Sequence, residues 1–142
     1  MVKAIGDSLL ANKYTERHYT MVDSSYFDIV VDGMDMAVNG GAGSTAGRAR
    51  IPGITVCGKT GTAENPHGVN KEDHSVFLCF APRENPKIAI AVYIENGGFG
   101  GTWAAPVASL MVEKYLTGGI TRSWEEERIL NANLMVNVKI RR

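Results

Sequence analysis

Two apolar segments joined by a short turn constrain the fold of this chain most. Residues 75–81 (SVFLCFA) and 87–95 (KIAIAVYIE) have the length of β-strands and are rich in β-branched and aromatic residues. The segment between them, 82–86 (PRENP), has a proline at each end and is typical of a turn. The sequence therefore predicts a β-hairpin here.

A third strand is predicted upstream of the hairpin, over residues 54–63 (ITVCGKTGTA). This segment is rich in β-branched residues but carries two glycines. Glycine inside a strand often marks a place where another backbone or a ligand comes close. Residues 64–74, which follow, are polar and show no helical periodicity. We therefore expect three antiparallel strands that follow one another in the chain.

Two amphipathic helices are predicted on either side of these strands. The first covers residues 24–38, where apolar side chains recur at spacings of three and four: Phe27, Val30, Val31, Met34 and Val38. The second covers residues 103–117, with Pro106 in its first turns and Gly118 as its stop. Together the elements predict an α+β fold, in which three strands pack with two helices.

Composition restricts the classes of partner. The 142 residues suit one domain or part of one, and 15 basic side chains balance 15 acidic ones. This balance gives no electrostatic footprint for nucleic acid or for an anionic membrane. No apolar run is long enough to span a bilayer, and the first residues do not resemble a signal peptide, so we expect a soluble chain without a targeting segment.

Cysteines and histidines do not predict a metal site. Cys57 and Cys79 lack metal-ligand spacing and are too few for a disulfide framework, so free buried thiols or a single bridge are the two alternatives. His18, His67 and His74 are scattered along the chain. We therefore expect no metal and no cofactor.

The last residues, 120–142, are expected to form a tail of unknown role beyond a domain at residues 1–119. They contain a run of charges at 125–128 (EEER), followed by a segment that suits a short strand or an unanchored tail. A charge run is usually a solvated face. We assign it no function.

A literal phosphate-loop pattern occurs at residues 53–60 (GITVCGKT), which match GxxxxGK[ST]. A phosphate loop needs a buried strand before it and a helix N-terminus directly after its lysine. Residues 48–52 (RARIP) are not a core strand, and Asn65-Pro66 prevents a helix from starting after the lysine. A nucleotide binder is therefore the remote alternative.

As part of a strand, the same residues predict a site for a carboxylate. Lys59, Thr60, Gly61 and Thr62 follow one another on an extended backbone. An ammonium and two hydroxyl groups offer hydrogen bonds to an anion. Gly61 has no side chain and would let an extended substrate lie against the strand.

The surrounding segments make this motif specific. With residues 56–64 (VCGKTGTAE), the hairpin region 74–98 and the helix 103–116, the chain resembles the C-terminal part of a class B penicillin-binding protein transpeptidase domain, of the penicillin-binding protein 2 type associated with cell elongation. The resemblance covers residues 20–118. It implies a parent protein that cross-links peptidoglycan stem peptides through a serine acyl-enzyme and is acylated by β-lactams. It also implies action at the periplasmic face of the bacterial inner membrane.

The resemblance also implies a role for each motif residue. Lys59, Thr60 and Gly61 match the motif that binds the terminal carboxylate of a D-Ala-D-Ala stem peptide or of a β-lactam, and Lys59 is a catalytic candidate. The backbone N–H of Thr62 matches an oxyanion-hole donor, and its side chain joins the substrate-binding group. We expect stem peptide and β-lactam to bind the full-length protein.

The nucleophile of this family is absent from the sequence. None of the seven serines is followed by lysine three residues on, or by asparagine two residues on: Ser8, Ser24, Ser25, Ser44, Ser75, Ser109 and Ser123. The family's Ser-x-x-Lys and Ser-x-Asn motifs are therefore missing, and the chain alone is expected to be inactive. The resemblance implies a five-stranded sheet with two strands from upstream, so we also expect an unpaired edge and self-association through it.

Three interpretations of function remain open from the sequence. The first is a part of a D,D-transpeptidase. The second is a same-fold relative that shares the Lys-Thr-Gly motif, which could be a serine β-lactamase, a D,D-carboxypeptidase or a penicillin-sensing domain. The third is a binding module without catalysis, in which Lys59 is merely retained.

Overall fold

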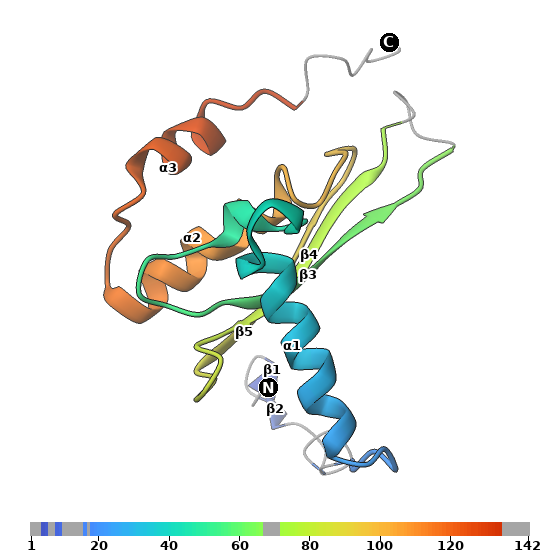
Figure 1. Ribbon diagram of the computed structural model, residues 1–142. Coiled ribbons are helices and arrows are strands. Elements are labelled where there is room, and N and C mark those ends of the chain that lie inside the picture. The colour runs from blue at the N-terminus through green and yellow to red at the C-terminus, as the bar shows by residue number, and fades with distance from the viewer. Residues whose placement is uncertain (1–3, 6–7, 10–15, 17, 67–71, 135–142) are drawn as a thin grey trace.

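The computed structural model describes residues 4–5, 8–9, 16, 18–66 and 72–134, and confirms the α+β class (Figure 1). In chain order the elements are β1 (Ala4–Ile5), β2 (Ser8–Leu9), α1 (Ser25–Asn39), the 3-10 turns η2 (Gly41–Gly43) and η3 (Gly47–Ala49), β3 (Cys57–Ala63), β4 (His74–Ala81), β5 (Ile88–Ile94), α2 (Ala104–Thr117) and α3 (Ser123–Leu130). The three predicted strands and both predicted helices are present, with bounds within three residues of those expected.

The main sheet has the order β3-β4-β5, and both pairs are antiparallel. Along β4, the buried positions alternate with more exposed ones, and Phe77 is fully buried. Thr60 lies opposite Phe77 and Thr62 lies opposite Ser75. Directly opposed residues share a face of the sheet. Thr60 and Thr62 therefore lie on the same face as the buried side chains of Phe77 and Ser75, which we call the buried face, whereas Lys59 and Gly61 lie on the other face.

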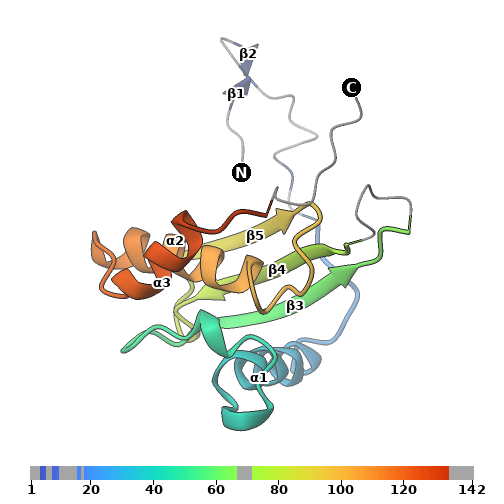
Figure 2. The same ribbon diagram turned by 90° about the horizontal axis from the view of Figure 1, so that it is seen from above.

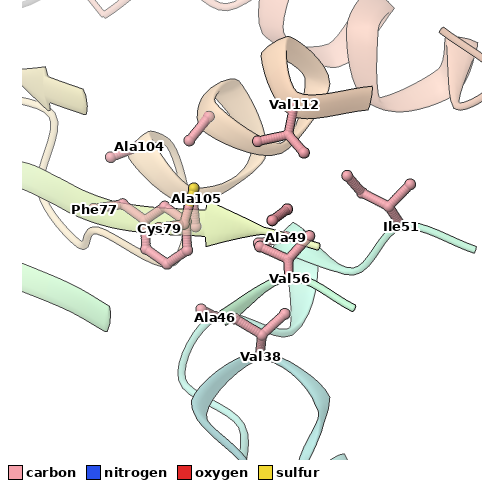
Figure 3. Close-up of a cluster of buried hydrophobic side chains, with 12 residues drawn as sticks. Val38, Ala46, Ala49, Ile51, Val56, Phe77, Cys79, Ala104, Ala105 and Val112 are labelled. Carbon is pink, nitrogen blue, oxygen red and sulfur yellow. The ribbon is translucent and has the colours of Figure 1, made fainter. Parts of the chain in front are cut away.

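Helices cover the two faces of the sheet unequally (Figure 2). Helices α2 and α3 lie on one side, while α1 lies on the other side beside β3. The core lies between α2 and the sheet and includes Val56, Phe77 and Val112 (Figure 3). Ala104, Ala105 and Ala108 are fully buried in α2. Their small side chains let the helix approach the sheet closely.

Helix α1 buries its predicted apolar stripe only toward its C-terminal end. Val38 is fully buried, but Phe27 and Val30 are 48% and 59% exposed. Burial increases toward the end of α1, where the helix packs against β3, and the first two turns of the helix are exposed. The pattern predicted the helix correctly, and the N-terminal half of its apolar stripe is exposed.

The predicted solvated charge run is instead part of helix α3, and Glu125 within it is fully buried. Arg128 and Arg48 supply the opposite charges that make this burial possible. The prediction of a solvated face was therefore wrong for Glu125. The pattern within residues 123–130 could not show that Glu125 is buried, because its partner Arg48 lies far upstream in the sequence.

Both cysteines are buried free thiols, as one of the two alternatives predicted. Burial raises the pKa of the Cys79 thiol to about 11 and also raises that of Cys57. Neither thiol is therefore ionised near neutral pH. In the part of the chain that the structure describes, no helix combines the length and the apolar character needed to cross a bilayer.

Candidate functional site

A pocket of about 770 Å³ lies between β3, the segment 41–50 that precedes it, and the loop that joins β5 to α2. Its lining carries five hydroxyl side chains, those of Ser44, Thr45, Thr60, Thr62 and Thr102. It also carries two guanidinium groups, from Arg48 and Arg50, and no acidic side chain among the described residues that line it. Such a lining favours an anion.

Strand β3 supplies Thr60 and Thr62 to this pocket because both lie on the buried face of the sheet. The Oγ1 atom of Thr60 donates to Oγ1 of Thr45 over 3.3 Å, which ties the preceding segment to the strand. Thr62 is exposed, so its hydroxyl group is accessible to a ligand. Because β3 is an outer strand of the sheet, alternate backbone groups along it have no partner strand among the residues that the structure describes.

The loop between β5 and α2 packs so closely on β3 that glycine is required. A Cβ atom at Gly100 would lie 2.6 Å from the carbonyl oxygen of Gly61, and it would also overlap the carbonyl of Val76. A Cβ atom at Gly101 would overlap the carbonyl oxygen of Thr45. The two glycines therefore let this loop form one wall of the pocket.

Ser75 fixes the end of the same loop from beneath. Its buried Oγ donates to the carbonyl of Phe99 over 3.1 Å and accepts from the backbone N–H of Ala104 over 3.1 Å. The second bond satisfies a free N–H group at the start of α2. One side chain of β4 therefore holds both the loop and the helix that follows it.

The two arginines of the pocket have different surroundings. Arg50 donates from Nε to the carbonyl of Val38 over 2.8 Å, and from Nη2 to the carbonyl of Gly41 and to Oγ of Ser44 over 3.1 and 2.8 Å. These bonds hold the turn after α1. Arg48 is 48% exposed, and its Nη1 lies 3.5 Å from Oε2 of Glu125. Arg48 is therefore the more available cation for a ligand.

Lys59 lies on the opposite side of β3. It is exposed, its Nζ donates to the carbonyl of Thr60 over 2.8 Å, and it lines a separate hollow of about 330 Å³ beside α1. Gly61 lies on the same face of the strand as Lys59. Three of the four predicted site residues thus line two different hollows, Thr60 and Thr62 the first and Lys59 the second, and Thr45 lines both.

Sequence reasoning missed Thr45, Arg48 and the glycine loop as parts of this site. The glycine clusters at 40–47 and 96–101 indicated loops. Local patterns do not show that the two loops meet over the same strand. That meeting depends on the register of β3 and β4 and on the packing of α2.

Comparisons with known proteins show the family and the fold of the chain. A model of the penicillin-binding protein transpeptidase domain matches residues 1–113. The peptidoglycan D,D-transpeptidase PbpA of Mycobacterium tuberculosis is 39% identical over 79 residues, which are 50% of this chain and 16% of that protein.

Two solved structures are similar in fold. Penicillin-binding protein 2 of Pseudomonas aeruginosa, in complex with WCK 5153, has a TM-score of 0.60 at 35% identity, over 75% of this chain and 23% of that one. Penicillin-binding protein A of Mycobacterium tuberculosis, as an imipenem acyl-enzyme complex, has a TM-score of 0.55 at 32% identity, over 68% of this chain and 20% of that one. This chain therefore spans less than a quarter of each of these relatives.

Proposed function

The chain belongs to the penicillin-binding protein transpeptidase domain family, and we propose that it supplies the carboxylate-binding part of a peptidoglycan D,D-transpeptidase of the penicillin-binding protein 2 type. Its ligand is the D-Ala-D-Ala end of a stem peptide, or a β-lactam in its place. The observation that carries the proposal is the pocket beside β3, where Arg48, Thr60 and Thr62 meet without an acidic neighbour among the described lining residues.

Thr60 and Thr62 bind the substrate carboxylate with their hydroxyl groups. They lie two residues apart on one face of the strand, so both can reach the same anion. Arg48 contributes positive charge from the facing wall. Gly61 leaves the opposite face of β3 without a side chain at this position, and an extended peptide lies along the edge of the strand.

Lys59 acts on the other side of the strand. In the proposed reaction a serine from another part of the protein attacks the amide carbonyl of D-Ala-D-Ala, and D-Ala leaves as an ester forms on the serine oxygen. The amine of a second stem peptide then displaces the serine and forms the cross-link. Lys59 assists the proton transfers of the serine, and the backbone N–H of Thr62 stabilises the oxyanion.

Calorimetry with two matched ligands tests this proposal. An acetylated peptide that ends in D-Ala-D-Ala is titrated into the chain, and the same peptide with a C-terminal amide serves as the control. The amide peptide lacks the negative charge of the C-terminal carboxylate. It should bind roughly tenfold more weakly or worse, because a charge-assisted hydrogen bond becomes a neutral one. Equal affinities for the two peptides would refute carboxylate recognition.

The proposed protein works at the periplasmic face of the bacterial inner membrane, where its substrate lies. This placement is supported by the membership in a family that acts on peptidoglycan. In isolation the chain is proposed to self-associate, because β3 and β5 are the outer strands of the described main sheet. A single monomeric species at all concentrations in sedimentation equilibrium would argue against this association.

A further inference from the structure

The pocket has two walls beside β3, which are the segment 41–50 and the loop between β5 and α2. Glu125 connects these two walls, although it lies on α3, beyond residues 1–113 that match the family model. Its side chain is completely buried. Its Oε1 accepts two hydrogen bonds from Arg128, from Nε over 3.3 Å and from Nη2 over 2.7 Å. Its Oε2 lies 3.5 Å from Nη1 of Arg48 and accepts no hydrogen bond within the described part of the chain. The carboxylate thus contacts one arginine of the pocket directly.

Arg128 extends this connection to the opposite wall. Its Nη2 also donates to the carbonyl of Thr102 over 2.9 Å, and its guanidinium carbon lies 4.7 Å from the centre of the Trp103 ring. Thr102 lines the pocket from the loop between β5 and α2. A contact of this kind between a cation and an aromatic face is favourable and restricts the orientation of the guanidinium. One carboxylate therefore holds both walls.

The residues before α3 strengthen the same arrangement. Arg122 donates from Nη1 to the carbonyl of Arg50 over 3.0 Å and to that of Arg48 over 3.5 Å. It fixes the backbone of the wall, and Glu125 fixes the side chain of Arg48.

The charges around Glu125 leave a positive excess for a ligand. Glu125 carries one negative charge and faces the two guanidinium groups of Arg48 and Arg128. Arg122 is already balanced by Glu113, so it does not compete. The pair with Arg48 is longer than the pair with Arg128, and Arg48 is half-exposed. Arg48 can therefore bind an anion without losing its buried partner.

We infer that Glu125 is a positioning residue, which holds Arg48, and through Arg128 also Thr102, at the places where the substrate carboxylate is bound. The inference rests on the proposed function. It assigns a role to the C-terminal helix α3, which the sequence had left without one. Glu125 does not touch the ligand and acts through Arg48.

The main test replaces Glu125 by glutamine. The Glu125→Gln side chain keeps its size and its acceptor for Arg128, but it loses the charge that attracts Arg48. Affinity for the D-Ala-D-Ala peptide should fall roughly tenfold, the order expected when one charge-assisted contact is lost. The matched control is Glu127→Gln, the same change on an exposed side chain of the same helix, which should bind as the wild type does. Unchanged or tighter binding by Glu125→Gln would overturn the inference.

A spectroscopic measurement separates positioning from stability. In ¹⁵N-labelled protein, the Nε–H signal of Arg48 and the amide of Thr102 should move in Glu125→Gln and stay in place in Glu127→Gln. A variant with Arg128→Lys keeps the charge but removes the two-pronged contact, and it should shift Thr102 even if Glu125→Gln does not fold.

The signals of Arg48 and Thr102 also distinguish a failure of the proposed function from a failure of the positioning role. If the wild type does not bind the peptide, the proposed function has failed, and displaced Arg48 and Thr102 signals in the variants would still support the positioning role. If those signals do not move, the positioning role is refuted regardless of binding.

Discussion

Arg122 donates from Nε to Oε2 of Glu113 over 2.9 Å, and the two side chains are only 9% and 2% exposed. The other carboxylate oxygen accepts from the backbone N–H of Thr121 over 3.0 Å and from its Oγ1 over 2.5 Å. These contacts fold the turn between α2 and α3 back on α2. Burial alone would raise the pKa of Glu113, but the hydrogen bonds from Thr121 and Arg122 together lower it below its ordinary value.

This lowered pKa predicts a dependence of stability on pH. The unfolded carboxyl group binds a proton more readily than the folded one, with an ordinary pKa of about 4.3. The stabilisation is therefore complete above that value and is lost as the pH falls through the lower folded pKa. The free energy of unfolding of the wild type, measured with urea, should fall as the pH is lowered through this range. The free energy of unfolding of Glu113→Gln should depend less on pH. Identical pH profiles for the two proteins would contradict the assignment.

Glu113→Ala should destabilise the fold strongly at neutral pH. It leaves the buried guanidinium of Arg122 without its partner, a change of about 3–5 kcal/mol in the free energy of unfolding. Glu126→Ala, a truncation of a carboxylate that is not fully buried, is the comparison. A loss below about 1 kcal/mol, which is the range of exposed ion pairs, would show that this pair is not a structural element.

Gly100→Ala should disturb the wall of the pocket. The added Cβ atom would meet backbone atoms of Gly61 and Val76, which cannot move without breaking the sheet. We expect a loss of about 1–3 kcal/mol in the free energy of unfolding and weaker peptide binding. Gly119→Ala is the control, because its Cβ atom has open space. Equal melting temperatures for the two variants would show that the loop does not pack as described.

The division of β3 between two hollows predicts different effects of its side chains on binding. Thr62→Val removes a hydroxyl group from the pocket and should weaken binding of the D-Ala-D-Ala peptide roughly tenfold. Lys59→Met removes a charge from the other face and should change the affinity less. Calorimetry with the acid and amide peptides measures both. A larger effect of Lys59→Met than of Thr62→Val would show that the carboxylate binds in the hollow beside α1 instead.

The chain alone should not form a covalent adduct with penicillin. Binding requires the pocket, but acylation requires a serine activated by a neighbouring lysine, and the sequence has no Ser-x-x-Lys. Incubation with fluorescent penicillin, followed by denaturing electrophoresis, should show no labelled band, whereas a full-length protein that contains this segment should be labelled. A labelled 142-residue chain would mean that another of its residues is nucleophilic.

Much of the fold was predictable because its signals are local. The hairpin follows from two apolar runs around 82–86, and α2 follows from Pro106 and Gly118. The division between Lys59 and Thr60 also follows from strand alternation, but which of them faces the pocket depends on the pairing of Thr60 with Phe77. Sequence periodicity carries no information about that pairing.

The rest of the site could not be predicted because it depends on distant contacts. Glu125 is buried because Arg48 and Arg128 neutralise it, and Gly100 is required because it contacts Gly61. From the sequence alone, Glu125 belongs to a charge run and Gly100 to a glycine-rich loop. Only the folded arrangement shows that these contacts form the walls of one pocket.

The most direct test of the account is a residue-resolved map of where the carboxylate binds. The ¹⁵N-labelled chain is titrated with the D-Ala-D-Ala peptide, and amide shifts are compared with those caused by the C-terminal amide. We expect the acid-specific shifts at Thr60, Thr62 and Thr102 and at the Arg48 side chain. Acid-specific shifts confined to Lys59 and the α1 residues Gly33 and Met36 would contradict the central claim that the carboxylate binds on the Thr60 and Thr62 face of β3.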